Sequence, residues 1–310
     1  MTETVIVTGG AGFIGSHLVR RLLADGARVR VIDNLSTGKR GNLDDVQGNI
    51  TLHEMSFTEL DMIRPVFDDV DLVYHIGALP SVPRSVKDPI ESDYHNTRGT
   101  LNVLVAARDA GVRRVVYAAS SSAYGDTEAD YKVETMIPAP LSPYGVAKLA
   151  GEYYCKAFTA SYGLETVCTR FFNVFGPRQD PDSHYAAVIP KFITMLLNGQ
   201  QPTIFGDGTQ SRDFTYIDNV LHGLTLAANA PHVNGLTVNL AMGGSVTLLE
   251  LVENLNELLG TKIEPVFLDS RAGDIKHSRA DISRAGELMG YEPVVSFKEG
   301  LKRTADYYRS

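Results

Sequence analysis

The sequence predicts an α/β protein, with a doubly wound parallel sheet and a smaller C-terminal α/β lobe that would bind the substrate. From residue 4 onward, short β-branched runs alternate with longer segments of helical period, an order typical of strand-helix-strand units around a parallel sheet. The runs lie at residues 5–7, 29–32, 72–74, 115–117 and 166–172. Polar loops with glycine and proline follow Gly176. We therefore expect a first lobe over residues 1–176, a second over 177–310, and a strand near 236–240 that returns to the first sheet.

The composition is that of a globular protein that needs neither disulfides nor metals to fold. At 310 residues and 44% hydrophobic content, the chain can bury a large core unaided. The formal net charge of −8 gives no broad positive field, which argues against a nucleic-acid partner. No apolar stretch is long enough to cross a bilayer, and neither the histidines nor Cys155 and Cys168 have metal-ligand spacing. We expect a cytoplasmic protein with two reduced, buried thiols, no metal and no membrane contact.

The turn after the first strand carries the first functional signal, the run Thr8-Gly9-Gly10-Ala11-Gly12-Phe13-Ile14-Gly15. It contains G-x-G-x-x-G and leads into a helix with Ile14, Leu18 and Leu22 on one face. Glycines at such a turn let the backbone approach a pyrophosphate, which rests on the helix N-terminus. The run could also be only a turn, but its place between a strand and a helix favours a Rossmann-type dinucleotide site.

The second strand ends in Asp33, which bears on the choice of cofactor. An acidic residue at about this distance from the glycines accepts hydrogen bonds from the adenosine ribose and repels a 2′-phosphate. Asp33 could instead be a solvated turn residue, but strand, loop, helix, strand and acid follow one another in the required order. We therefore predict NAD, rather than NADP, as the cofactor.

A tyrosine and a lysine four residues apart indicate acid–base chemistry. Tyr144 and Lys148 follow Pro143 at the start of a helical stretch, so both side chains share one face. The lysine ammonium would lower the pKa of the phenol, and a nicotinamide cation would lower it further, so that the phenolate serves as a base. Taken alone, such a pair is more often ordinary helix surface. The preceding glycine-rich turn favours the functional interpretation here.

Three serines, Ser120, Ser121 and Ser122, end the strand that begins at Val115. They would lie at the C-terminal edge of the sheet, where open α/β proteins bind their ligands. A hydroxyl there could donate to a substrate oxygen and shuttle its proton. Three serines could equally form a polar loop, so their position rather than their chemistry carries the hypothesis.

Together these residues resemble the extended short-chain dehydrogenase/reductase superfamily and, within it, the UDP-sugar 4-epimerases that act on UDP-glucose or UDP-N-acetylglucosamine. The resemblance covers essentially the whole chain. The matching motifs are the glycine run at 8–15, Asp33-Asn34, Ser120 with Tyr124-Gly125, Tyr144 with Lys148, and the segments at 170–173, 206–208, 211–214, 271–274 and 280–281. Matches spread over both lobes are more specific than any one motif.

The resemblance implies a role for many residues and a homodimer formed by two helices of the first lobe. It assigns the catalytic hydroxyl to Ser120, the base to Tyr144 and its electrostatic partner to Lys148. The cofactor-binding residues would be Gly9, Gly12, Phe13, Ile14, Gly15, Asp33, Asn34, Ser36, Thr37, Gly38, Phe57, Gly77, Ala78, Asn96, Tyr144 and Lys148. The substrate-binding residues would be Pro80, Ser81, Ser120, Ser121, Ser122, Tyr144, Phe172, Asn173, Ala187, Val188, Ile204, Phe205, Arg212, Arg271, Asp274 and Ser278.

The implied reaction is epimerisation of a UDP-hexose at C4. Tyr144 would remove the 4-hydroxyl proton as the C4 hydride passes to NAD, and the 4-keto sugar would rotate and take the hydride back on its other face. Related dehydratases carry an Asp-Glu pair, and decarboxylases a Glu, close to the positions of Ser121 and Ser122, which disfavours both reactions. Two alternatives stay open: a UDP-glucuronate 4-epimerase, and a catalytically silent NAD-sensing protein.

Three positions bear on how closely the chain follows the family pattern. Ser56 stands where the family usually has an aspartate that contacts adenine, and Gly77 replaces the first alanine of a His-x-Ala-Ala motif. In the family, the residue three before Asp281 borders the sugar's 2-substituent. That position is Ser278, and a small residue there leaves space for an N-acetyl group. Ser278 could instead only cap the turn into the next helix, because serine is a favoured N-cap residue.

Overall fold

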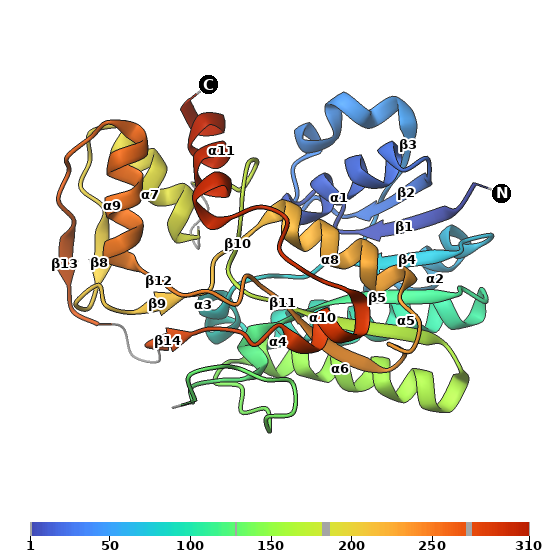
Figure 1. Cartoon of the computed structure of the whole chain (residues 1–310). Coiled ribbons are helices and arrows are strands. Elements are labelled where there is room, and N and C mark those ends of the chain that lie inside the picture. The colour runs from blue at the N-terminus through green and yellow to red at the C-terminus, as the bar shows by residue number, and fades with distance from the viewer. Residues whose placement is uncertain (1, 128, 182–186, 271–274, 310) are drawn as a thin grey trace.

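The computed structural model describes residues 2–127, 129–181, 187–270 and 275–309. Within this part of the chain, the centre of the molecule is a seven-stranded sheet of order β11-β6-β5-β4-β1-β2-β3 (Figure 1). Its strands are β1 (Thr4–Thr8), β2 (Arg28–Asp33), β3 (Ile50–Glu54), β4 (Leu72–His75), β5 (Arg114–Ser120), β6 (Glu165–Phe171) and β11 (Leu236–Leu240). Their pairings are parallel. The predicted doubly wound α/β fold is confirmed, with the strand order of dinucleotide-binding proteins.

Helices cover both faces of this sheet, and the strand sequences explain why. Val5 and Val7 of β1 point into one core, while Ile6 between them points into the other. On the first side lie α1 (Phe13–Ala24) and α8 (Ile217–Asn229), and on the second α5 (Gly99–Asp109) and α6 (Pro143–Tyr162) (Figure 1). The crossovers also contain η1 (Arg40–Asn49), α2 (Leu60–Ile63), η2 (Arg64–Phe67), α3 (Val82–Lys87), α4 (Pro89–Asp93), η3 (Tyr94–Arg98) and η4 (Ser121–Ala123).

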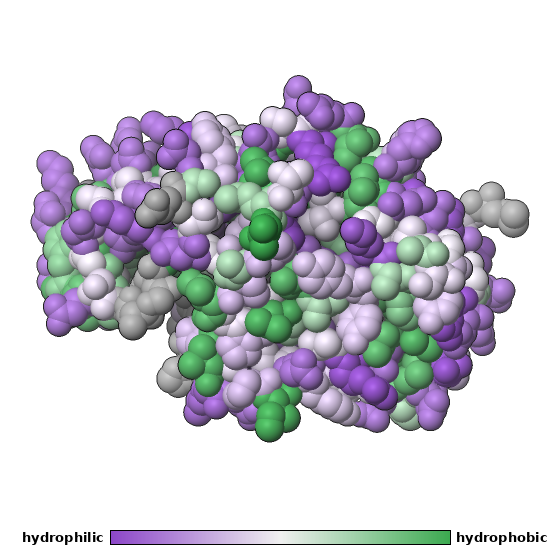
Figure 2. All heavy atoms as spheres, turned by 90° about the horizontal axis from the view of Figure 1, so that it is seen from below, coloured by the Kyte–Doolittle hydropathy of each residue, from purple (hydrophilic) through white to green (hydrophobic). Residues whose placement is uncertain are grey.

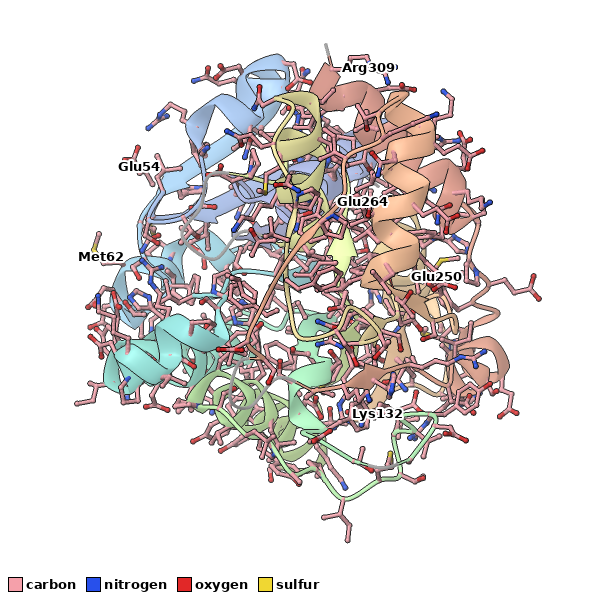
Figure 3. The ribbon with its side chains drawn as sticks, turned by 90° about the vertical axis from the view of Figure 1, so that its left-hand side faces the viewer. Glu54, Met62, Lys132, Glu250, Glu264 and Arg309 are labelled. Atoms are coloured by element: carbon pink, nitrogen blue, oxygen red, sulfur yellow. The ribbon has the colours of Figure 1, made fainter. Side chains whose placement is uncertain are left out.

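A smaller lobe lies beside the C-terminal ends of these strands. Its helices are α7 (Val188–Leu197), α9 (Leu248–Leu259) and α11 (Phe297–Arg309), whereas α10 (Ser283–Met289) packs against β11 at the edge of the large sheet. Its strands are β7 (Val174–Phe175), β8 (Thr203–Phe205), β9 (Ser211–Arg212), β10 (Thr215–Tyr216), β12 (Val246–Thr247), β13 (Val266–Leu268) and β14 (His277–Ser278). Figure 3 looks onto this lobe from outside, with Glu250 and Glu264 labelled on it. Because these strands are only two or three residues long, packing among α7, α9 and α11 holds much of the lobe.

The chain crosses between the two lobes more than once. After Gly176 it builds part of the smaller lobe, but α8 then packs on β5 and β6, and β11 pairs with β6 at the edge of the sheet. The boundary between residues 176 and 177 stays a prediction.

Among the helices of the described residues, none has both the length and the apolar character needed to span a membrane.

Candidate active site

A cavity of about 1050 Å³ lies above the C-terminal ends of the central strands. Its volume is that of a site for a large ligand. Of the residues predicted to hold the cofactor, it is lined by Gly9, Gly12, Phe13, Ile14, Gly15, Asp33, Asn34, Ser36, Thr37, Gly38, Phe57, Gly77, Ala78, Tyr144 and Lys148. Asn96 lies behind the wall, where its amide oxygen accepts from the Leu79 nitrogen at 2.8 Å. Besides Tyr144, the predicted substrate residues Pro80, Ser81 and Ala187 line the same cavity.

The floor of the cavity is the glycine turn between β1 and α1. Gly9 has a φ of +68°, and a Cβ atom there would lie 2.6 Å from the Gly77 Cα atom. A Cβ on Gly15 would lie 2.1 Å from the Gly9 carbonyl oxygen. Helix α1 starts after Gly12, which has no side chain to cap the first backbone N–H groups. These groups therefore remain available to bind the phosphates of a dinucleotide.

Asp33 stands at the edge of this floor, at the end of β2. Its carboxylate accepts hydrogen bonds from the backbone nitrogens of Ala11 at 2.9 Å and Leu35 at 2.8 Å. Burial raises the pKa of Asp33, and these two hydrogen bonds offset part of that rise. Asp33 is only 6% exposed, so the alternative of a solvated turn residue is wrong.

Tyr144 and Lys148, the pair predicted to be catalytic, lie at the start of helix α6. Ser142 caps the helix by accepting from the Gly145 nitrogen at 3.1 Å, and Pro143 occupies its first turn. Tyr144 and Lys148 both reach the cavity wall. The Lys148 ammonium donates to the Ala118 carbonyl oxygen at 2.9 Å. Burial lowers the pKa of Lys148 to about 8.

The phenol of Tyr144 does not follow the sequence-based expectation. Burial raises its pKa to about 12, although its interaction with the Ser120 hydroxyl offsets part of the rise. The expected lowering of the phenol pKa is therefore wrong for the protein's own groups, because burial outweighs the lowering that Ser120 supplies. The positive charge of an oxidised nicotinamide would have to supply the lowering.

The serine cluster lies at the end of β5, next to Ala118 and Ala119 of the cavity wall. Ser120 is buried, and its hydroxyl donates to the Ser122 hydroxyl at 3.0 Å and accepts from the Ser122 nitrogen at 3.1 Å. Ser121 and Ser122 begin the short turn η4. The interaction of Ser120 with the Tyr144 phenol favours the catalytic interpretation over a polar loop.

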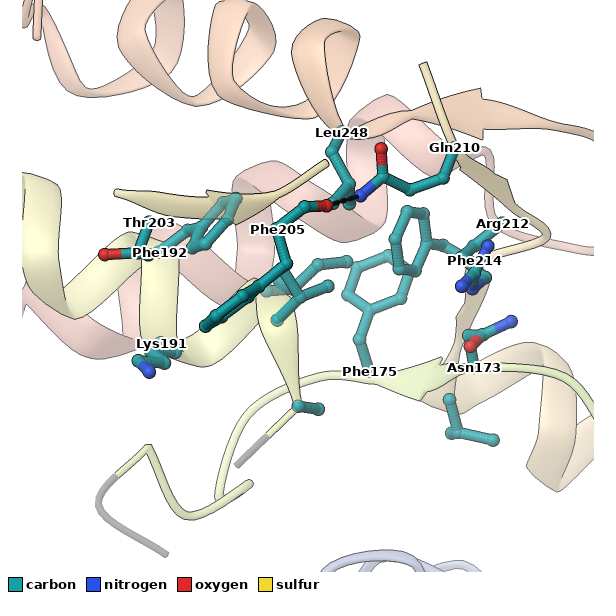
Figure 4. A pocket seen from close by; sticks show the side chains of 14 residues that line it. Asn173, Phe175, Lys191, Phe192, Thr203, Phe205, Gln210, Arg212, Phe214 and Leu248 are labelled. Atoms are coloured by element: carbon teal, nitrogen blue, oxygen red, sulfur yellow. Dashed lines mark hydrogen bonds between the residues drawn. The ribbon is translucent and has the colours of Figure 1, made fainter. Parts of the chain in front are cut away.

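A second cavity of about 320 Å³ opens in the smaller lobe (Figure 4). It contains five residues predicted to bind substrate: Asn173, Ala187, Val188, Phe205 and Arg212. Other residues that line this cavity were not predicted from the sequence: Phe175, Lys191, Phe192, Thr203, Gln210, Phe214 and Leu248. Gln210 donates to the Phe205 carbonyl oxygen at 2.5 Å and so fixes one wall. Ala187 lines both cavities, so the two adjoin there.

Other predicted substrate residues lie elsewhere. The side chains of Phe172 and Ile204 are fully buried behind the walls, and Arg271 and Asp274 lie outside the described residues. Ser278 is buried in β14, where it pairs with Arg212 of β9. The alternative that Ser278 caps the next helix is wrong, because α10 begins at Ser283 with Ile282 at its N-cap. Phe192 could have been predicted as a wall residue, because it lies four residues after Val188 on the same helix. No sequence pattern around the short strand β9 indicated that Gln210 would line the cavity.

The two departures from the family pattern have local explanations. A Cβ on Gly77 would lie 2.6 Å from the Phe57 ring, so Phe57 packs where an alanine methyl would stand. Ser56 hydrogen-bonds the Thr58 hydroxyl at 2.7 Å within its own turn. An effect of Ser56 on adenine binding stays a prediction.

Among the described residues, no group of three or more His, Cys, Asp or Glu side chains could hold a metal ion.

Comparison with known proteins agrees with this geometry. Residues 5–241 match the NAD dependent epimerase/dehydratase family. A UDP-glucose 4-epimerase of Mycolicibacterium smegmatis is 37% identical over 98% of each chain. The structure of a UDP-N-acetylglucosamine 4-epimerase from Methanobrevibacter ruminantium, in complex with UDP-N-acetylmuramic acid, superposes with a TM-score of 0.95 at 41% identity, covering 100% and 99% of the two chains.

A third relative has its cofactor in place. The structure of a UDP-glucuronic acid 4-epimerase from Bacillus cereus, with UDP-glucuronic acid and NAD, has a TM-score of 0.91 at 34% identity over 99% of each chain. The glycine turn, Asp33 and the paired Tyr144 and Lys148 fit NAD in the larger cavity. The chain belongs to the NAD-dependent epimerase/dehydratase family, and its cofactor is NAD.

Proposed function

We propose that the protein is a UDP-hexose 4-epimerase that interconverts UDP-glucose with UDP-galactose and UDP-N-acetylglucosamine with UDP-N-acetylgalactosamine. One observation carries this proposal. Tyr144 and Lys148 line the larger cavity, and the buried Ser120 interacts with the Tyr144 phenol. This cavity adjoins a second one that contains Arg212. The first arrangement suits proton transfer beside a nicotinamide, and the second suits a nucleotide diphosphate.

Each residue has a defined part in the chemistry. Bound NAD would accept the hydride from the sugar C4 atom and return it. Tyr144 takes the proton of the 4-hydroxyl group and gives it back, while Lys148, held by the Ala118 carbonyl oxygen, keeps a positive charge beside it. Ser120 donates to the sugar oxygen and shares the proton with the Tyr144 phenol. Because the cycle is redox-neutral, the protein has no need to release its cofactor, and we expect it to purify with NAD bound.

The smaller cavity would receive the UDP moiety. Arg212 offers a guanidinium fork to the pyrophosphate, and Asn173 and Val188 line the same cavity. The family pattern adds Arg271 and Asp274 to this set as proposals. Ser278, three residues before Asp281, would border the sugar's 2-substituent.

Two alternatives are separated by one experiment. A UDP-glucuronate 4-epimerase would use the same Tyr144 chemistry with a different contact at C6, as the similarity to the Bacillus cereus enzyme suggests. A silent NAD-sensing protein would not need Ser120, Tyr144 and Lys148 together. The purified protein is incubated separately with UDP-glucose, UDP-N-acetylglucosamine and UDP-glucuronate, and kcat/KM is measured for each by NMR of the anomeric protons. Preference for UDP-glucuronate, or no turnover of any of the three, would contradict the proposal.

We also propose a cytoplasmic homodimer. Exposed apolar side chains gather along α6 and the packed helices α3 and α4: Val86, Ile90, Val146 and Tyr153 are 53–82% exposed. Figure 2, which views the molecule from below, shows hydrophobic spheres on this side. A second copy would cover this face by antiparallel packing of helices. Light scattering should give twice the chain mass for the wild type, and Ile90→Asp should shift it to the monomer.

A further inference from the structure

A buried polar chain runs beneath the turn that carries Ser120. Tyr124, four residues later, donates a backbone hydrogen bond to the Ser121 carbonyl oxygen at 3.0 Å and so closes this turn. Its buried hydroxyl donates to the Asn239 amide oxygen at 2.7 Å. The Tyr124 ring also packs against the Arg170 guanidinium, at 4.4 Å from the ring centre. The position of the catalytic turn therefore depends on what holds Asn239.

Asn239 is fully buried in β11, and its side chain joins three segments. Besides accepting from Tyr124, its amide nitrogen donates to the carbonyl oxygens of Lys132 and Asp281, each at 2.9 Å. These two segments are also paired with each other, because the Asp281 nitrogen donates to the Lys132 oxygen at 3.0 Å. Asp281 follows Ser278 of β14 by three residues. One side chain thus ties the catalytic turn to the segment proposed to border the sugar.

The other end of the chain reaches the helix of Tyr144 and Lys148. Arg170 lies opposite Asn239 in the register of β6 and β11. Its guanidinium binds the Glu152 carboxylate through two hydrogen bonds of 2.8 and 2.6 Å, and both side chains are buried. Glu152 stands four residues after Lys148 on α6, and its charge counteracts the lowering of the Lys148 pKa that burial causes. The connected groups therefore extend from α6 to the serine turn.

We propose that Asn239 is a positioning residue that holds the Ser120 turn in register with Tyr144 and, at the same time, fixes segment 277–281 of the substrate lobe. An amide suits this place because it donates twice and accepts once, whereas an aspartate cannot donate to two carbonyl oxygens. Loss of the amide leaves buried polar groups unpaired on both sides. A displacement of the catalytic groups by about 1 Å is enough to cost a large factor in rate. The kinetic part of this inference rests on the proposed epimerase function.

Two substitutions test it, each with a matched control. Tyr124→Phe removes the hydroxyl that binds Asn239 and also interacts with the Arg170 guanidinium, and Tyr291→Phe removes an equally buried hydroxyl whose bond goes to the Ala241 carbonyl oxygen at 2.9 Å. Asn239→Ser is matched by Asn219→Ser, since Asn219 is also a fully buried amide but ties α8 to Val294 and Val295.

The variants should differ in kinetics as well as in stability. Tyr124→Phe should lower kcat about tenfold with KM for the UDP-sugar unchanged, because only the catalytic turn moves. Asn239→Ser should lower kcat and also raise KM, since it frees both segments, and adding Tyr124→Phe to it should cause no further loss. Both controls should lower the melting temperature but keep kcat and KM within about twofold. Wild-type kcat in Tyr124→Phe, or equal losses in the controls, would overturn the proposal.

A second measurement does not depend on activity. Hydrogen exchange of the backbone amides of Ser122 and Tyr124 should become faster in Tyr124→Phe and stay at the wild-type rate in Tyr291→Phe. The amide of Asp281 should exchange faster in Asn239→Ser but not in Asn219→Ser. Unchanged exchange at these amides would refute the positioning role. If the wild type turned over none of the UDP-sugars, the proposed function would fail. The exchange rates would still show whether Asn239 holds the Ser120 turn and the segment 277–281 in place.

Discussion

The two halves of the proposed site, the larger cavity for the cofactor and the smaller one for the substrate, are built differently. The cofactor cavity lies on strands of four to seven residues, and its floor is a glycine turn whose shape backbone contacts impose. The walls of the proposed substrate cavity come from strands of two or three residues, from the loops beside them and from one side of helix α7. Buried side chains tie these short pieces together. Asp213, for example, accepts from the Met242 and Ala280 nitrogens at 2.9 and 3.3 Å.

This difference separates two kinds of sensitivity to mutation. Added atoms should damage the cofactor half, because its backbone segments leave no room for a Cβ atom. Lost or altered polar groups should damage the substrate half, because hydrogen bonds rather than long strands hold it. The catalytic pair stands where the two halves meet, and the largest effect is expected there.

At the junction, Tyr144→Phe should lower kcat at least about a hundredfold, the lower end of the loss expected for a general acid–base group. Folding and UDP binding should stay nearly intact, because the ring remains. Steady-state kinetics and calorimetric titration with UDP measure the two effects. The control is Tyr162→Phe, an exposed tyrosine at the end of the same helix and outside the proposed dimer face, which should keep wild-type turnover. Near-normal activity in Tyr144→Phe would remove Tyr144 from the mechanism.

In the cofactor half, Gly15→Ala should weaken NAD binding at least about tenfold, since the new methyl would meet the Gly9 carbonyl oxygen at 2.1 Å. The amount of nicotinamide nucleotide released by acid from the purified protein, together with Kd for added NAD, measures this loss. Gly48→Ala is the control, because nothing lies within 4 Å of a Cβ atom there. Equal retention of NAD by both variants would show that the turn tolerates bulk.

In the substrate half, Ser278→Tyr should selectively abolish turnover of UDP-N-acetylglucosamine by overlapping with the acetamido group. The wild type should accept the acetylated substrate at least comparably to UDP-glucose. The measured quantity is the ratio of the two values of kcat/KM, which should fall at least about tenfold in the variant. Ser278→Ala should leave this ratio as in the wild type. A ratio that does not change in Ser278→Tyr would end the assignment of Ser278 as a gate.

A smaller effect concerns pH and Asp213. Burial raises the pKa of this carboxyl from 3.8 to about 6, so the folded protein binds its proton more tightly than the unfolded chain does. The resulting stabilisation is complete below the unfolded pKa and is lost as pH rises through about 6. Asp213→Asn should remove this loss. As pH rises from about 4 to 7, the melting temperature of the wild type should therefore fall by a few degrees relative to that of the variant.

The control for the pH effect is Asp207→Asn. Its carboxyl is exposed, and the hydrogen bond from the Thr209 side chain lowers its pKa, so any contribution has the opposite sign. Its stabilisation is present at neutral pH and is lost as pH falls. Parallel melting curves for Asp213→Asn and the wild type at every pH would show that Asp213 does not titrate differently in the folded protein.

The same division explains how much the sequence could predict. The glycine run, Asp33 and the Tyr144–Lys148 spacing are local patterns on regular elements, and the structure brings them to one cavity. Gln210 and Phe214 were not predicted because their directions depend on two-residue strands that no local pattern fixes. The raised pKa of Tyr144 also escaped prediction, since burial is a property of the packed site. Asn239 gave no signal in the sequence, because each of its three partners lies far from it along the chain.

The central claim is that one hydride leaves the sugar C4 atom and returns to it while Tyr144 moves the proton. Its most direct test uses UDP-glucose labelled with deuterium at C4 in ordinary water, with NMR analysis of the epimer. The account predicts UDP-galactose that retains the deuterium at C4, over many turnovers without added NAD. Loss of the label to solvent, or stoichiometric reduction of NAD without epimer, would contradict it.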